Sequence, residues 1–188
     1  MTLKIIALTG PKGSGKDTVA QLIARQYDNV RTIAFADPIK QVIQGLFDLD
    51  KSSNEQYDSF KRTDIKYQLE GHLNHGVSGR NVVREIGMLM RRYDEKQFTN
   101  YVVRNIRYLP DCVWIVTDLR FDNEYMVLKD LNAKIVKITR PEYHYDGHIT
   151  ERGFDNSLVD YQLLNDGDLA YLDTRVESIM NNIMKEWA

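Results

Sequence analysis

The chain has 188 residues, which is enough for a domain with a sizeable buried core. Its formal net charge of −2 gives no overall attraction to nucleic acid or to an anionic membrane, and no apolar run approaches the length that spans a bilayer. The single cysteine, Cys112, excludes an internal disulfide and fits a reducing compartment, so we expect a cytoplasmic protein.

The first predicted elements are a strand, a loop and a helix in immediate succession. Residues 5–8 form a continuous apolar run, as a strand buried on both faces does, and apolar residues recur at helical spacing over 19–27. Between them, Gly10, Gly15 and Lys16 have the spacing of a phosphate-binding loop. Glycines let successive backbone N–H groups surround an anion, and the lysine reaches the outer phosphates of a nucleoside triphosphate. This order favours phosphate binding over an ordinary glycine-rich turn.

One position departs from the usual loop pattern. Asp17 stands where a metal-binding hydroxyl residue is expected, and Thr18 comes one position late. A carboxylate beside a triphosphate would repel it unless Mg²⁺ bridges the two. Thr18 is the competing ligand. We favour Asp17, because the next residue is rotated by about 100° around the helix.

Further along the chain, strand and helix patterns alternate. In chain order they predict strand 30–36, helix 39–47, helix 80–92, helix 98–106, strand 112–117, helix 122–131, strand 134–139, strand 161–165 and helix 172–187. Residues 48–79 are polar, and we interpret them either as a mobile insertion over a site or as a plain surface excursion. The alternation predicts an α/β fold with a mostly parallel, five-stranded central sheet and helices on both faces.

Candidate site residues lie where predicted strands end. In a doubly wound sheet, ligands bind at the carboxyl ends of the strands. Residues 10–18, Asp37, Asp118 with Arg120, and Arg140 all lie at such ends, so we expect them to converge. Asp118 has two possible roles, since it could hold Mg²⁺ through water or orient Arg120 and a substrate hydroxyl.

One predicted helix is rich in arginine. Arg80, Arg84, Gly87 and Arg91 share a face by their spacing, and Gly87 would let a ligand or another backbone approach closely. We favour anion binding by Arg80 and Arg84, whereas Arg91 and Arg92 fit a solvated face equally well. A cationic face suits a phosphate acceptor, which is ionised near neutral pH and needs no general base. This favours a nucleotide kinase over a kinase that acts on alcohols.

The histidines do not predict a zinc site. His72 with His75, and His144 with His148, lack a third ligand at a telling spacing. His148 and Glu151 fit a polar lid that closes over phosphate, or a simple exposed loop.

Several segments spread over the chain combine into one family pattern. They are Gly10-x4-Gly15-Lys16-Asp17-Thr18, Phe35-Ala-Asp37-Pro38-Ile-Lys40, Gly79-Arg80-x3-Arg84-x2-Gly87, Thr117-Asp118-Leu-Arg120-Phe-Asp-Asn-Glu124, Arg140-Pro141 with His148-x2-Glu151, and Leu164-Asn165-Asp166-Gly167. With these segments the chain resembles the deoxynucleoside monophosphate kinases of bacteriophages, a branch of the P-loop nucleotide kinases. The resemblance implies conversion of a dNMP to a dNDP, with ATP as the donor and Mg²⁺ as the cofactor.

The same resemblance implies an architecture. It is a P-loop kinase three-layer sandwich formed as one domain over 1–188, with 48–108 as a helical insertion that binds the nucleoside monophosphate and 140–156 as a lid-like loop. Family members often act as dimers, so a homodimer is expected, with small-molecule nucleotides as the other partners. Nucleic acid and membranes are not expected as partners.

The resemblance also assigns roles to residues of this chain. The catalytic groups would be Lys16, Arg84, Asp118, Arg120 and Arg140. ATP binding falls to Gly10, Lys12, Gly13, Ser14, Gly15, Lys16, Asp17 (which would also hold Mg²⁺) and Thr18, with an adenine-binding turn at Asn165 and Gly167. dNMP binding falls to Asp37, Lys40, Arg80, Arg84, Gly87, Met88, Tyr101, Asp118, Arg120 and Glu124. The chain has Met88 where the family usually has a small hydroxyl residue, and Phe98 or Tyr101 where tryptophan is common, which leaves the base preference open.

Two other functions remain as alternatives. One is a kinase of the same core that acts on dephospho-coenzyme A or phosphomevalonate. The other is a regulatory or assembly protein that binds ATP without transferring phosphate.

Overall fold

The computed structural model describes residues 3–50, 55–62, 78–141 and 154–188. The chain divides into two compact units, one formed by Met1–Phe35 with Val102–Ala188 and the other by Ala36–Tyr101. The insertion expected at 48–108 falls mostly in the second unit, which begins earlier, at Ala36. No helix in the described parts of the chain is both long enough and apolar enough to cross a membrane.

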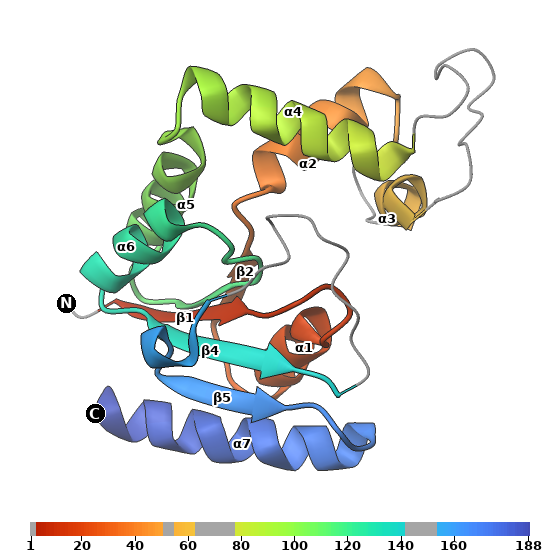
Figure 1. Cartoon of the computed structure of the whole chain (residues 1–188). Coiled ribbons are helices and arrows are strands. Elements are labelled where there is room, and N and C mark those ends of the chain that lie inside the picture. Colours follow the sequence, from red (N-terminus) through yellow and green to blue (C-terminus); the bar gives the residue numbers. More distant parts are fainter. Residues whose placement is uncertain (1–2, 51–54, 63–77, 142–153) are drawn as a thin grey trace. The chain divides into compact units, whose positions relative to one another are not determined.

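The first unit contains one parallel sheet (Figure 1). Its strands are β1 (Lys4–Thr9), β2 (Val30–Ile33), β3 (Val113–Val116), β4 (Lys134–Thr139) and β5 (Tyr161–Leu164). They lie in the order β2-β3-β1-β4-β5, and each neighbouring pair is parallel. The predicted five-stranded α/β sheet is therefore confirmed, with the first strand of the sequence at its centre.

Helices cover both faces of this sheet. They are α1 (Lys16–Gln26), the second half of α5 (Gln97–Tyr108), α6 (Asp122–Asp130) and α7 (Leu169–Glu186), and a short 3₁₀ helix spans Asn156–Leu158. Ile6 and Leu8 of β1 pack into one core with α1 and α7, while α6 lies on the opposite side of the sheet (Figure 1). Since side chains alternate along a strand, the central strands must be apolar on both faces, and β1 is buried from Ile5 to Thr9.

Two predicted strands are shorter than expected. The segment 30–36 is a strand only to Ile33, because the Phe35 N–H donates to the Asp118 carboxylate at 2.7 Å and Ala36 already caps the following helix. The last strand ends at Leu164, one residue earlier than expected, although the Asn165 N–H still donates to the Thr139 carbonyl oxygen of β4 at 2.8 Å. At the first of these ends, the bond to the Asp118 side chain replaces a strand partner, and such a bond leaves no mark in the apolar pattern.

The second unit is helical. It contains α2 (Asp37–Leu46), α3 (Glu55–Arg62), α4 (Gly79–Tyr93) and the first residues of α5, and α4 contacts both α2 and α3. Gly79 starts α4 at a point where a Cβ would lie 2.0 Å from the Phe60 carbonyl oxygen, so only glycine fits there. Gly87 is approached by the Ile39 side chain, 2.9 Å from its hypothetical Cβ. The close approach expected at Gly87 thus comes from a side chain of α2.

Candidate functional site

The loop between β1 and α1 has the backbone of an anion-binding site. Gly10, Gly13 and Gly15 have φ angles of 136°, 77° and 103°, which other residues rarely adopt. A Cβ on Gly10 would lie 2.1 Å from the Ile138 carbonyl oxygen, and one on Gly15 would lie 2.5 Å from Asn165 Nδ2. Substitution at either of these two glycines would therefore both strain the backbone and displace a neighbour.

Lys16 folds back onto this loop. Its Nζ donates to the carbonyl oxygens of Gly10 at 2.8 Å and Pro11 at 2.7 Å. The helix that Lys16 starts has Gly15 as its N-cap residue, which offers no side-chain cap, and the N–H groups of a first turn have no acceptor within the helix. An ammonium group, an uncapped helix N-terminus and its dipole together favour an anion at this position.

Two buried hydroxyl groups lie next to the loop. Thr9 ends β1 and Ser14 lies within the loop, and both are at least 99% buried. Among the residues that the structure describes, neither hydroxyl has a hydrogen-bond partner. Buried polar groups are rarely left unsatisfied, so this pair marks a place where a ligand or water supplies the missing bonds.

The residues expected to bind the metal lie at the same helix start. Asp17 is exposed in the first turn of α1, while Thr18 is half-buried. Within the described ranges, no three or more His, Cys, Asp or Glu residues gather in a way that could hold a metal ion. A single carboxylate is a donor set that fits Mg²⁺, which commonly binds one or two protein carboxylates together with substrate phosphates. Lys12 and Gly13, the other expected loop residues, are exposed.

The turn after β3 is fixed at successive residues. Asp118 Oδ1 accepts the Phe35 N–H at 2.7 Å, and the Leu119 N–H donates to the Leu8 carbonyl oxygen at 3.2 Å. The Arg120 N–H then donates to the Glu124 carboxylate at 3.0 Å. The backbone that carries the Arg120 side chain is thereby held to β1, to the segment after β2 and to α6.

Glu124 has a structural task in this turn. It is 1% exposed, and its Oε2 accepts the N–H groups of Arg120 at 3.0 Å and Phe121 at 3.2 Å. Phe121 is the N-cap of α6 and Glu124 its third residue, which is the position from which an acidic side chain bonds back to the cap. The resemblance assigned Glu124 to the monophosphate site, and that role stays a prediction; the structure shows that its carboxylate bonds to the backbone of Arg120 and Phe121.

The ends of β4 and β5 lie at the same edge as the loop, because the strands are parallel and Thr9 is in register with Lys137. Arg140 follows β4 and is exposed. Asn165 follows β5, and its Nδ2 donates to the Ser14 carbonyl oxygen at 2.9 Å. The convergence expected of the strand ends is thus found within the first unit. Of the expected lid, His148 and Glu151 lie outside the described residues, as do the histidines at 72, 75 and 144.

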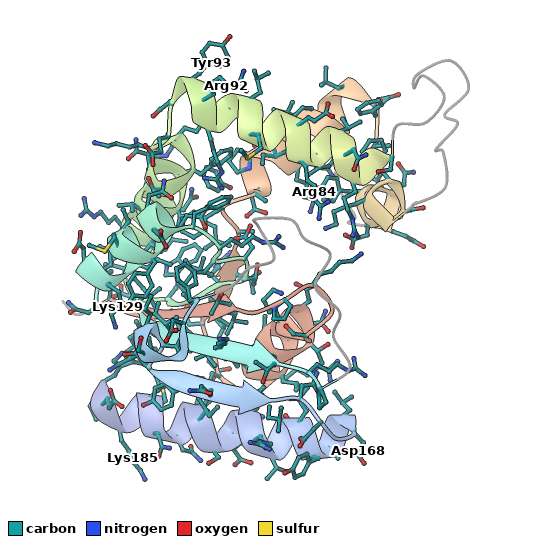
Figure 2. All side chains as sticks on the ribbon, in the orientation of Figure 1. Arg84, Arg92, Tyr93, Lys129, Asp168 and Lys185 are labelled. Atoms are coloured by element: carbon teal, nitrogen blue, oxygen red, sulfur yellow. The ribbon has the colours of Figure 1, made fainter. Side chains whose placement is uncertain are left out.

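The remaining expected residues belong to the second unit. Asp37 is in the first turn of α2, and Lys40 on the same helix lies over the Tyr57 ring, 5.6 Å from its centroid. Arg80 and Arg84 on α4 are half-buried. Tyr93 is the last residue of α4 and is exposed, and Arg84 projects from the opposite side of this helix (Figure 2).

Four further residues of the second unit complete the predictions. Met88 and Tyr101 were expected near the nucleoside, and for Arg91 and Arg92 the sequence left open whether they bind an anion or lie on a solvated face. Met88 is 46% exposed and Tyr101 half-buried. The Arg91 guanidinium lies over the Phe98 ring, 4.5 Å from its centroid, so Arg91 is not part of a simple solvated face. Arg92 is exposed, as expected for such a face.

Comparison with known proteins shows the family of this chain. The model of the family described as deoxynucleotide monophosphate kinase matches residues 4–109 and 82–176. The chain belongs to this family. A relative from Acanthamoeba polyphaga mimivirus, described as a "Putative deoxynucleotide monophosphate kinase", is 29% identical over 150 residues, which are 73% of this chain and 74% of the relative. The chain is therefore a nucleotide kinase, and its activity is that of a phosphotransferase.

Solved structures of low sequence identity share the fold of this kinase. A dephospho-CoA kinase from Campylobacter jejuni has a TM-score of 0.52 at 14% identity, covering 97% of this chain and 98% of that one. The protein TT1252 from Thermus thermophilus has a TM-score of 0.52 at 13% identity, with the same coverage of 97% and 98%. These similarities confirm the expected P-loop kinase fold.

Sequence reasoning missed two groups in the site of this kinase. Thr9 carries the only hydroxyl in the apolar first strand, and that isolated polar residue was the available signal. The bond from the Phe35 N–H to Asp118 joins positions far apart in the sequence, and no local pattern could have indicated it.

We expect Glu124→Ala to lower kcat/KM of the kinase by roughly tenfold or more, and Glu124→Gln to keep most of it. Alanine removes this acceptor from two partly buried backbone N–H groups, at up to about 1–3 kcal/mol for each, whereas glutamine still offers a carbonyl oxygen. Steady-state kinetics and melting temperatures of both variants check this. An equal loss in the glutamine variant would show that the negative charge is needed, as for a substrate-binding role.

Proposed function

We propose that this kinase transfers the γ-phosphoryl group of ATP to a deoxynucleoside monophosphate, giving dNDP and ADP. The observation that carries the proposal is the glycine loop, over which Lys16 Nζ bonds to the carbonyl oxygens of Gly10 and Pro11 beside an uncapped helix N-terminus. The buried Thr9 and Ser14 hydroxyls, which have no partner among the described residues, support a polyanionic ligand at this loop. Membership of the deoxynucleotide monophosphate kinase family supports the acceptor.

The chemistry needs positioning and positive charge more than covalent help. An oxygen of the acceptor's phosphate forms a bond to the γ-phosphorus, the bond from that phosphorus to the β–γ bridging oxygen breaks, and ADP leaves with the electron pair. In this proposal, the loop N–H groups and Lys16 hold the donor phosphates. Arg120 stabilises the charge that develops during transfer, and Arg140 supplements it.

No general base is required for this acceptor, because a monophosphate is already ionised near neutral pH. Asp118 is therefore not needed as a base. Its bond to the Phe35 N–H supports a different role, which is to hold the turn that carries Arg120. Of the two roles open for Asp118, we therefore favour orientation of Arg120 over binding of a metal.

Mg²⁺ belongs to the proposal as the cofactor. When bound, it offsets the negative charge of the triphosphate. Asp17 would hold it from the first turn of α1, and Thr18 is the alternative ligand. The exposed Asp17 carboxylate fits this role, since Mg²⁺ binds oxygen ligands and keeps several waters.

The acceptor would be bound by residues of the second unit. Asp37, Lys40, Arg80 and Arg84 are the candidates for its phosphate and sugar, and the half-buried positions of Arg80 and Arg84 support them. Guanidinium groups suit this task because their paired N–H donors match phosphate oxygens. A homodimer stays a prediction of the family resemblance.

The test is a panel of acceptors. ADP formation is measured with ATP and Mg²⁺ and, in turn, each of the four dNMPs, the four NMPs and dephospho-coenzyme A. We expect dNMPs to react well above the others, with a Lys16→Met preparation as the background control. Equal rates on NMPs would refute the deoxy assignment. Activity on dephospho-coenzyme A alone would replace the proposal with the first alternative, and ATP binding without transfer to any acceptor would favour the regulatory protein.

A further inference from the structure

One side chain ties the turn after β5 to the phosphate loop. Asn165 Nδ2 donates to the Ser14 carbonyl oxygen at 2.9 Å. The Asn165 backbone is itself anchored, because its N–H donates to the Thr139 carbonyl oxygen at 2.8 Å. The same Nδ2 lies 2.5 Å from the position that a Cβ on Gly15 would take, so the amide is packed against the loop.

This bond sets the orientation of the peptide between Ser14 and Gly15. No peptide bond in the described residues is cis, and in a planar trans peptide the C=O and N–H groups point in opposite directions. A Ser14 carbonyl that points at Asn165 therefore turns the Gly15 N–H away from Asn165. Gly15 is the N-cap residue of α1, so this N–H has no acceptor within the helix.

Gly15 does little to hold this orientation by itself. Its φ is 103°, and glycine adopts positive and negative φ angles with similar ease. If the peptide rotated, the Ser14 carbonyl oxygen would take the place of the Gly15 N–H. A phosphate at the loop would then face a partial negative charge in place of a hydrogen-bond donor.

We propose that Asn165 is a positioning residue, which orients the Gly15 N–H toward the phosphates of the bound triphosphate through its bond to the Ser14 carbonyl. The proposal rests on the proposed function only in that the loop binds a triphosphate. It differs from the adenine-binding role that the family resemblance implies for Asn165. A residue that reads the base matters only when a base is present, whereas one that orients a loop N–H matters for any triphosphate.

Inorganic tripolyphosphate separates these roles, because it has no base. Dissociation constants for ATP and for tripolyphosphate, both with Mg²⁺, are measured by calorimetry on the wild-type chain, on Asn165→Ala and on Asn165→Leu, which keeps the side-chain size. We expect both variants to bind both ligands roughly tenfold more weakly, by the same factor for each ligand. A loss confined to ATP, or no loss at all, overturns the proposal.

Asn29 offers a matched control. Its Nδ2 also donates to a loop carbonyl, that of Asp111 at 3.0 Å, at the amino ends of β2 and β3. Asn29 has a φ of 56°, so Asn29→Ala adds backbone strain, and we expect it to lower the melting temperature at least as much as Asn165→Ala. The dissociation constants of Asn29→Ala for ATP and for tripolyphosphate should equal those of the wild-type chain. Equal weakening in Asn29→Ala would show that lost stability, not the loop peptide, causes the effect.

The outcomes for the two proposals are distinguishable. If the wild-type chain binds tripolyphosphate with the expected dependence on Asn165 but transfers no phosphoryl group to any acceptor, the kinase proposal fails and the role of Asn165 stands. If the wild-type chain binds neither ligand, both fail.

Discussion

Replacing Lys16 with methionine should lower kcat/KM for ATP on the order of 10²–10³-fold, the effect of removing one preorganised charged donor. Lys16 Nζ bonds to the carbonyl oxygens of Gly10 and Pro11, which places its ammonium group over the loop. Methionine has a similar length and fills the same space, so the loop keeps its packing. The loss should appear in both ATP affinity and turnover, since the ammonium group contacts the donor phosphates before and during transfer.

Lys129→Met is the control for this substitution. Lys129 lies on α6 (Figure 2). Its ammonium group pairs with the Asp160 carboxylate at 3.1 Å. An exposed pair of this kind contributes about 0–1 kcal/mol, so we expect a slightly lower melting temperature and unchanged kinetics. Steady-state kinetics with varied ATP and calorimetric ATP binding check both variants. Full activity in Lys16→Met would exclude the loop as the donor site.

The fold could be predicted because its signals are local. The apolar run 5–8, the spacing of Gly10, Gly15 and Lys16, and the apolar stripes of the helices each lie within a few residues. Adjacent segments in the sequence then determine the order of strand, loop and helix. The order of strands in the sheet is a different matter, since it depends on which faces pack together, and only the structure gives it.

The direction of side chains could not be predicted from motifs. The family resemblance selected both Glu124 and Asn165 and assigned each a ligand to bind, and these ligand roles stay predictions. The structure adds bonds that the motifs did not indicate, from the Glu124 carboxylate to the backbone of Arg120 and Phe121 and from the Asn165 amide to that of Ser14. Bonds between a side chain and a distant backbone group follow from packing, so they leave no periodic pattern. Residues that shape a site therefore look the same in sequence as residues that bind the ligand.

Arg120 gives the second large effect, and it separates an enzyme from a protein that only binds ATP. We expect Arg120→Ala to lower kcat on the order of 10³-fold, as for arginines that stabilise the transition state of phosphoryl transfer, while ATP affinity changes little. The support is the turn that carries it, whose backbone is held by bonds of Asp118 with Phe35 and of Arg120 with Glu124. Such anchoring limits the positions that the guanidinium group can reach.

Two further substitutions test whether the effect is specific to the Arg120 guanidinium group. Arg120→Lys should restore little, because an ammonium group lacks the paired donors of guanidinium. Arg104→Ala, at an exposed position on α5, should leave kcat unchanged. Kinetics are measured at saturating ATP with a dNMP as acceptor, and ATP binding by calorimetry. A regulatory ATP-binding protein should be impaired by Lys16→Met but not by Arg120→Ala, whereas a kinase should lose turnover with both, because the first residue holds the donor phosphates and the second acts on the group in transfer.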